Sequence, residues 1–487
     1  MSRQRALRLL LLALAGLATI LLVRTARFTS KQVAVEPALP LALDRQALAE
    51  RLAAALRIET VSHQEQSQIS GEAFLAFHRY LGEQYPLVHR RLRREVVNGY
   101  SLLYTWEGSE PGRKPIILLS HLDVVPVEPG TEAQWSYPPF AGRIAEGFIW
   151  GRGALDDKFG VLGILEAVEA LLGSGFQPRT TVYLAFGHDE ELGGERGAQE
   201  IVNLLQSRAV AAEYVLDEGG ALLRGLLPGL AMPVGAIGIA EKGSVSIELS
   251  ARTEGGHSSA PPPRTAVGLV SSAVHEVERH PLPAELRGAT RQLIEHIGPE
   301  LPLLYRVVCA NLWLFGGVLE RLLANTPATN ATLRTTTAAT IIAGGVKENV
   351  LPASARAVIN FRILPGDSVA GVLEHVRRAV GNPQVSVQAL SAGREASAES
   401  PTDTAAFGVL RRTIREVYPE ALVAPYLTLG ATDARRYVAL TQNIYRFTPI
   451  VGEPSDLARI HGTNERIALE HYEGAVQFFA RLIQNSG

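Results

Sequence analysis

Three short apolar runs in the first half of the chain each end in a cluster of histidine or acidic residues. The runs are Ile116–Leu119, Thr181–Phe186 and Tyr214–Leu216. Their length predicts buried strands, and the helical patterns between them predict an α/β domain with a mostly parallel sheet. Because ligands in open α/β sheets bind beyond the carboxyl ends of the strands, we expect the three clusters to meet at one place.

The three clusters are Ser120–Asp123, His188–Glu191 and Asp217–Gly219. In the first, His121 and Asp123 are two residues apart, so both side chains point the same way on an extended segment. With 12 histidines and 49 acids in 487 residues, about one such pair is expected by chance, so the pair alone is weak evidence. The neighbouring clusters support a functional role for the pair.

The pattern of the chain changes along its length. Alternating strands and helices with a Pro-rich stretch predict an inserted α+β domain in the middle, and the last hundred residues return to an α/β pattern that ends in a helix over 464–483. The predicted segments are an N-terminal segment (1–30), a linker (31–43), the first part of the α/β domain (44–238), the insertion (239–392) and the second part of the α/β domain (393–487).

The N-terminal segment contains an uncharged apolar run, Leu9–Val23, with three arginines before it and two after it. This pattern predicts an export signal or a membrane anchor, and the lack of a clear small-x-small cleavage site favours the anchor. Since the positive end stays inside, the rest of the chain is expected outside the cytoplasm, on the periplasmic side in a bacterium. A buried first helix is disfavoured because the run has no amphipathic face.

Composition limits the partners and the chemistry. The net charge of −2 gives no electrostatic reason to expect nucleic-acid binding, so a small substrate is the default. The single cysteine, Cys309, excludes an intrachain disulfide and a thiolate metal cluster. Any metal is therefore expected on histidines and carboxylates.

Two acidic motifs fit metal-assisted hydrolysis, and each also has a purely structural explanation. In Gly151–Lys158 the glycines allow a tight turn before a predicted helix, and Asp156 or Asp157 either caps that helix or bridges two metals. Glu190 and Glu191 are either a solvated acidic pair or a general base beside a metal ligand. The surrounding clusters favour the chemical role in both motifs.

Together these segments resemble the M20 family of metallopeptidases and aminoacylases, and within it the branch of carboxypeptidase S and the N-fatty-acyl-amino-acid hydrolase/synthases. The resemblance implies a zinc-exopeptidase-like catalytic domain with an inserted lid or dimerisation domain. The matching segments, in family order, are SHLDVVP, GRGALDDK, GHDEELGG, VLDEGG, EKGSVSIEL, GGHSSAPP, KENVLP, NFRI and IHGTNERI.

The resemblance also implies roles for individual residues. Two zinc ions, replaceable by cobalt or manganese, would be bound by His121 and His461, bridged by Asp156 and further held by Glu191. The remaining ligand is Asp217 or Glu218, with Asp217 favoured by analogy with the dipeptidase branch. Asp123 would orient His121, Glu190 would be the general base, and the Asp156–Asp157 peptide bond would be cis.

Substrate contacts come from the same resemblance. His257 in the insertion would help to hold the oxyanion, often in the partner subunit's site, which implies a homodimer. Arg362 would clamp a substrate carboxylate, for which a guanidinium fork is suited. Asn349, Thr432 and Asp433 are further candidate contacts. Taken alone, His257 is more typical of a structural or exposed histidine. For Arg362 an exposed position on a strand is the less favoured alternative.

The expected activity is hydrolysis of the amide bond of an N-acyl amino acid. The acyl chain can be long, and the enzyme can also catalyse the reverse reaction, synthesis. The alternatives are a carboxypeptidase or dipeptidase acting on peptides, and a catalytically silent binding homologue. The apolar segment around Leu312–Phe315 either covers an acyl chain or forms the core of a lid. A nucleotide-binding protein is disfavoured because no glycine-rich phosphate motif opens a helix.

Overall fold

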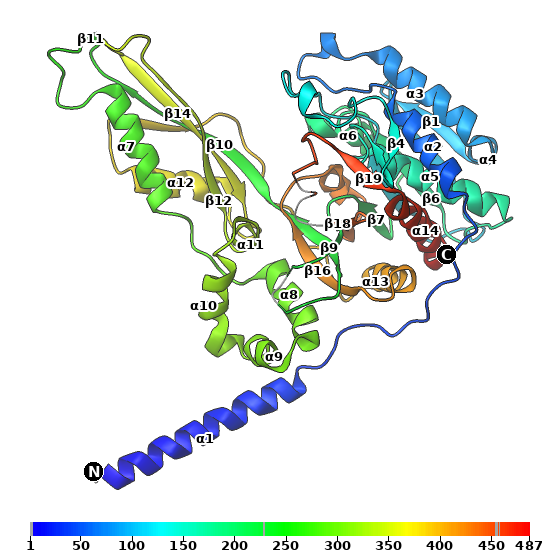
Figure 1. Cartoon of the computed structure of the whole chain (residues 1–487), viewed down its shortest axis with the longest axis horizontal. Coiled ribbons are helices and arrows are strands. Elements are labelled where there is room, and N and C mark those ends of the chain that lie inside the picture. The colour runs from blue at the N-terminus through cyan, green and yellow to red at the C-terminus, as the bar shows by residue number, and fades with distance from the viewer. Residues whose placement is uncertain (1–2, 227–228, 453–455, 457) are drawn as a thin grey trace. The chain divides into compact units, whose positions relative to one another are not determined.

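The computed structural model describes residues 3–226, 229–452, 456 and 458–487, and these fall into two compact units (Figure 1). The first unit contains residues 1–30, 240–399 and 427–431, and the second contains 31–239, 400–426 and 432–487.

The second unit is built on a large mixed sheet, whose strand order in the described residues is β1-β2-β6-β3-β7-β17-β9-β8-β18, with β16 beside β9. The four central strands, β6, β3, β7 and β17, are parallel to one another. The strands are β1 (Arg93–Val97), β2 (Ser101–Trp106), β3 (Ile116–His121), β6 (Val182–Gly187), β7 (Tyr214–Asp217), β8 (Leu222–Leu223), β9 (Val234–Glu241), β16 (Leu422–Thr428), β17 (Ile444–Arg446) and β18 (Val451–Gly452).

The three predicted buried strands are confirmed as β3, β6 and β7, with ends that differ from the predicted ones by one or two residues. Ile117 and Leu119 of β3 pack on one face of the sheet with α6 (Ala198–Ser207) and the short helix η5 (Asp433–Ala439). Successive side chains alternate between faces, so the buried Ile116 and Leu118 point to the other face, where α5 (Lys158–Gly173) lies.

Around this sheet lie helices and a small three-stranded sheet. The helices are α2 (Arg45–Leu56), α3 (Gly71–Gln84), α4 (Pro86–Arg91), α13 (Ala405–Val417) and α14 (Leu469–Ser486); the small sheet contains β4 (Arg143–Ala145), β5 (Phe148–Trp150) and β19 (Arg466–Ala468). The prediction of a helix from residue 464 was wrong at its start, because residues 466–468 pair with β5 as strand β19. The predicted linker has no regular structure, and Asp44 caps α2 with its side chain.

The first unit contains the expected α+β insertion. Its sheet has the order β12-β14-β10-β15, and α7 and α12 pack on it around Ile247, Ile359 and Phe361. The elements are β10 (Gly243–Arg252), β11 (Gly256–His257), α7 (Ala266–Arg279), α8 (Gly288–Ile297), α9 (Leu303–Ala310), α10 (Leu312–Leu323), α11 (Pro327–Ala331), β12 (Thr336–Gly344), β13 (Val350–Leu351), β14 (Ser354–Ile363), α12 (Val369–Val380) and β15 (Val385–Ala389).

The same unit contains the N-terminal helix α1 (Arg3–Arg27), which includes the whole predicted apolar run. Its mean hydropathy over an 18-residue window is 2.5, and its length and composition are sufficient to cross a membrane. Helices α9 and α10 pass the same test only as a pair, and they are bent by 112° at the break between them.

Candidate metal centre

The three clusters meet at the carboxyl end of the parallel strands, as the sequence predicts. His121 is the last residue of β3, and β3 pairs in parallel with both β6 and β7. Glu190 and Glu191 follow β6, and Asp217 ends β7. The parallel pairing places all three strand ends at the same edge of the sheet.

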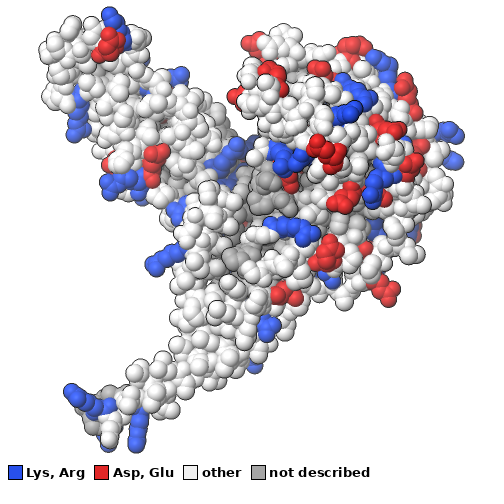
Figure 2. Space-filling model, viewed as in Figure 1, with Lys and Arg blue, Asp and Glu red and all other residues white. Residues whose placement is uncertain are grey.

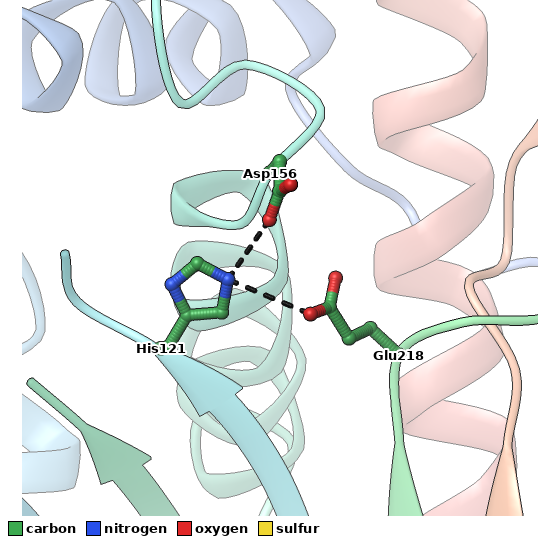
Figure 3. Close-up of side chains that lie close together, drawn as sticks. All are labelled: His121, Asp156 and Glu218. Carbon is green, nitrogen blue, oxygen red and sulfur yellow. Dashed lines mark hydrogen bonds and ion pairs between the residues drawn. The ribbon is translucent and has the colours of Figure 1, made fainter. Parts of the chain in front are cut away.

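His121 faces two carboxylates with one ring nitrogen (Figure 3). Its Nε2 lies 2.9 Å from Asp156 Oδ1 and 3.5 Å from Glu218 Oε1. The other ring nitrogen, Nδ1, lies 2.9 Å from the backbone oxygen of Asp123 and 3.4 Å from its carboxylate. The side chain is only 2% exposed, so Asp123 fixes a buried imidazole whose Nε2 is directed at the carboxylates.

A second imidazole approaches the other oxygen of Asp156. His461 Nε2 lies 2.9 Å from Asp156 Oδ2 and 3.2 Å from Glu191 Oε2. The potential ligand atoms of His121, Asp156 and Glu218 all lie within 4.8 Å of one another, as do those of Asp156, Glu191 and His461. Asp156 therefore belongs to two His–carboxylate groups, with one oxygen toward each.

The turn that carries Asp156 shows no helix capping by either aspartate side chain. Asp157 occupies the N-cap position of α5, but its side chain makes no cap hydrogen bond and instead accepts one from the Ser120 hydroxyl. The Asp156–Asp157 peptide bond is cis, as the resemblance implied. The capping explanation of these two residues is thus not what the structure shows.

A buried ion pair connects the two segments that carry Asp156 and His461. Arg152 Nη1 lies 2.5 Å from Glu465 Oε2, and the two side chains are 2% and 0% exposed. Arg152 also donates to the backbone oxygen of His461, and Glu465 accepts the backbone N–H of Asp156. Arg152 and Glu465 have no predicted role from the sequence, although they lie in the motifs GRGALDDK and IHGTNERI.

The structure favours Glu218 over Asp217 as the residue that faces His121. The Asp217 carboxylate accepts the backbone N–H groups of Glu218 and Ala434, at 3.0 and 2.7 Å. Glu218 is instead directed at the imidazole. The analogy that favoured Asp217 is therefore not supported by this geometry.

Glu190 and Glu191 do not form a solvated acidic pair. The Glu191 side chain is 6% exposed, and the backbone N–H groups of both residues donate to the Asp123 carboxylate at 3.2 Å. Asp123 thus holds the acidic pair and His121 together. Gly194, at a φ of +69°, leaves room for the Asp433 carboxylate, which a β-carbon at that position would overlap.

Burial and mutual repulsion make the negative form of the clustered carboxylates costly unless a positive charge lies beside them. Burial raises the pKa of Glu218 to about 8 and that of Glu190 well above its usual range. Burial alone would lower the pKa of His121, but hydrogen bonds to the surrounding carboxylates raise it well above the usual value. Hydrogen bonding to Asp156, above all, raises the pKa of His461 to about 10. The cluster therefore favours bound positive charge.

The other predicted contacts are distributed over both units. Thr432 and Asp433 are buried in the second unit, where Asp433 opens η5. His257, Asn349 and Arg362 lie in the first unit and are exposed. His257 Nδ1 lies 2.8 Å from the Ser259 hydroxyl, and Arg362 belongs to β14.

Comparison with known proteins assigns the family. Residues 117–485 match the model of peptidase family M20/M25/M40, so the chain belongs to this family and is a metal-dependent hydrolase. A probable carboxypeptidase S-like 2 of Dictyostelium discoideum is 42% identical over 97% of this chain and 92% of its own length. The N-fatty-acyl-amino acid synthase/hydrolase PM20D1 of Homo sapiens is 40% identical over 91% of this chain and 88% of its own.

Solved structures with the same fold have much lower sequence identity. An M20 family metallo-carboxypeptidase, Sso-CP2 from Sulfolobus solfataricus, has a TM-score of 0.65 at 18% identity, covering 90% of this chain and 98% of its own. Human carnosine dipeptidase 1 has a TM-score of 0.64 at 17% identity, covering 91% and 96%. These similarities confirm the predicted fold class.

Proposed function

We propose that the chain uses two zinc ions to hydrolyse the amide bond of N-acyl amino acids next to a free carboxylate, with synthesis by reversal. The observation that carries this proposal is the pair of His–carboxylate groups that share Asp156. Relatives about 40% identical over most of the chain are named N-fatty-acyl-amino acid synthase/hydrolases, which favours acyl amino acids as the substrate class.

The donor set fits zinc. Imidazole nitrogens and carboxylate oxygens are common zinc ligands. Glu191 Oε1 is buried and has no hydrogen-bond partner within the described ranges, so this oxygen is available to a cation. We assign one ion to His121, Asp156 and Glu218, and the other to Asp156, Glu191 and His461; cobalt or manganese can substitute.

When bound, the ions supply Lewis acidity, which lowers the pKa of a water molecule and polarises the scissile carbonyl. Glu190 lies outside both ligand groups and is assigned as general base: it accepts the proton of the attacking water on a carboxylate oxygen and delivers it to the leaving nitrogen. Asp123 positions this base by holding its backbone N–H. His257 is assigned to the oxyanion, in the same chain or across a homodimer.

Substrate selection is assigned to groups that recognise a carboxylate. The Arg362 guanidinium offers two parallel donors, which match the geometry of a free carboxylate. Asn349, Thr432 and Asp433 are assigned as further contacts. The apolar helix α1 is assigned as an export signal or membrane anchor, with the catalytic part outside the cytoplasm.

A direct comparison of substrates tests the proposal. For the zinc-loaded full chain, kcat/KM for N-oleoyl-phenylalanine is expected to exceed that for benzyloxycarbonyl-Gly-Leu by about tenfold or more, since each buried methylene of an acyl chain contributes about 0.8 kcal/mol. N-Oleoyl-phenylalanine amide, which lacks the free carboxylate, is the control and is expected to react poorly.

The other results of this assay point to the two alternatives. A preference for the blocked dipeptide would instead support a carboxypeptidase, the activity in the name of the 42% identical relative. Failure to hydrolyse either substrate, together with failure to bind zinc, cobalt or manganese, would support a catalytically silent homologue.

A further inference from the structure

Helices α9 and α10 expose an unusual number of large apolar side chains. On α10, Leu314, Val318 and Leu322 follow one another at intervals of four residues, so they form one stripe on the helix surface. We define the α9–α10 patch by the exposed large apolar residues of both helices, which range from 42% to 74% in exposure: Leu303, Leu304, Tyr305, Trp313, Leu314, Val318 and Leu322.

Few charges interrupt this surface. From Leu303 to Leu323 the charged residues are Arg306, Glu320 and Arg321, and Glu320 accepts the backbone N–H of Leu286. Figure 2 shows basic side chains gathered at the N-terminal end of α1, whereas the rest of α1 and the neighbouring part of the first unit are largely free of charged side chains. Apolar patches of this kind on soluble proteins usually mark a binding surface.

Hydrogen bonds connect the bend between α9 and α10 to the C-terminal end of α1. Asn311, at the bend between α9 and α10, is fully buried, and its Nδ2 donates to the Leu21 backbone oxygen and the Thr25 hydroxyl at 3.4 Å. Arg24 donates to the backbone oxygen of Ala310 at 3.4 Å. A bilayer crossed by α1 would therefore have α9, which contacts α1, at the surface where α1 emerges, with α10 beginning beside it and leading away from α1 (Figure 1).

We propose that the α9–α10 patch rests in the interfacial layer of the lipid bilayer that α1 crosses, with lipid as its occupant. An exposed tryptophan with arginines nearby is typical of residues at the level of the lipid head groups. The proposal rests on the proposed function in one respect, the assignment of α1 as a membrane anchor. It deepens that function because long-chain N-acyl amino acids partition into the same lipid layer. A second copy of the chain is the competing occupant.

Tryptophan fluorescence tests the proposal without using activity. Trp106, Trp135 and Trp150 are at most 8% exposed, whereas Trp313 is 56% exposed. The full chain is reconstituted into phosphatidylcholine vesicles containing lipids with a quenching spin label, and the signal of Trp313 is the difference from W313F. A label near the head group is expected to lower this signal about twofold or more, and a label near the chain end to lower it less.

Two variants sharpen the test. Replacing Leu314, Val318 and Leu322 by Gln removes the stripe and is expected to abolish quenching by lipid. The matched control replaces Ile341 and Ile342, which are 48% and 64% exposed on β12, by Gln and is expected to leave quenching unchanged.

Two outcomes would overturn the proposal. In the first, Trp313 is quenched by aqueous acrylamide but not by labelled lipid. In the second, Trp313 is shielded from both quenchers only as protein concentration rises, which would identify a second copy as the occupant. Neither outcome depends on which substrate is hydrolysed, so failure of this proposal is distinguishable from failure of the proposed function.

Discussion

Replacing Glu190 by Gln is expected to lower kcat by about three orders of magnitude while leaving the metal content unchanged. Glu190 is assigned as the group that moves the proton, and it belongs to neither ligand group. Burial raises the pKa of this carboxyl, because the neutral form, which Gln imitates, is the easier one to bury. The fold is therefore expected to tolerate the change. Steady-state kinetics and metal analysis on the same sample measure both quantities.

The control for this variant is Glu195→Gln, because the Glu195 side chain is 83% exposed and lies in the same acidic segment. It is expected to retain the activity of the unmodified enzyme. Activity of Glu190→Gln within about tenfold of that enzyme would remove Glu190 from the role of general base. Loss of metal from Glu190→Gln would instead indicate that the residue is a ligand.

Replacing Arg152 by Met is expected to destabilise the metal-free protein by about 3–5 kcal/mol, because it leaves the buried Glu465 carboxylate without its partner. The same change removes the donor to the backbone oxygen of His461, so metal affinity is expected to fall by about 10- to 100-fold. Denaturant unfolding in the presence of a chelator measures the first effect, and competition with a zinc indicator measures the second.

The pH dependence of this destabilisation has a defined sign. Burial raises the pKa of Glu465 from 4.5 to about 7 in the folded protein, so stability associated with this group is present below pH 4.5 and is lost as pH rises toward 7. Without Arg152 the folded pKa rises further, and the loss extends to higher pH. The difference in unfolding free energy between Arg152→Met and the unmodified protein is therefore expected to be larger at pH 8 than at pH 5.

The matched control is Arg179→Met, which removes an ion pair with Glu110 at 2.6 Å whose side chains are 57% and 43% exposed. Exposed pairs contribute about 0–1 kcal/mol, so little change in stability is expected. Equal effects of the two substitutions would show that the Arg152–Glu465 pair does not position the centre.

The sequence was sufficient to predict the strands that carry the site. β3, β6 and β7 are short apolar runs with polar residues at their carboxyl ends, and that pattern is local. The meeting of their ends follows from parallel pairing, a general property of α/β sheets. The cis bond after Asp156 and the family came from resemblance, since no local pattern in the composition indicates either.

Two details could not be predicted because they depend on tertiary contacts. Adjacent residues at the end of a strand point in different directions. Asp217 is held by the backbone N–H groups of Glu218 and Ala434, and Glu218 is the residue that faces His121. The helical pattern of the last segment continues through residues 466–468, but pairing with β5 turns these residues into a strand. The intrinsic strand or helix propensity of a segment does not tell which other strand lies beside it in the fold.

The Arg152–Glu465 pair could not be predicted for a similar reason. The two residues are 313 positions apart in the chain, and each one by itself is typical of an exposed surface residue. Each of the two motifs contains a charged residue, and this was the only sequence feature that pointed to an ion pair. The sequence does not show which charged residues are buried together.

Anomalous diffraction at the zinc edge from crystals of the zinc-loaded protein tests the central claim most directly. The account predicts two peaks per chain, one beside His121 and Glu218 and the other beside Glu191 and His461, with Asp156 between them. Active crystals whose zinc peaks lie away from Asp156 would contradict the account.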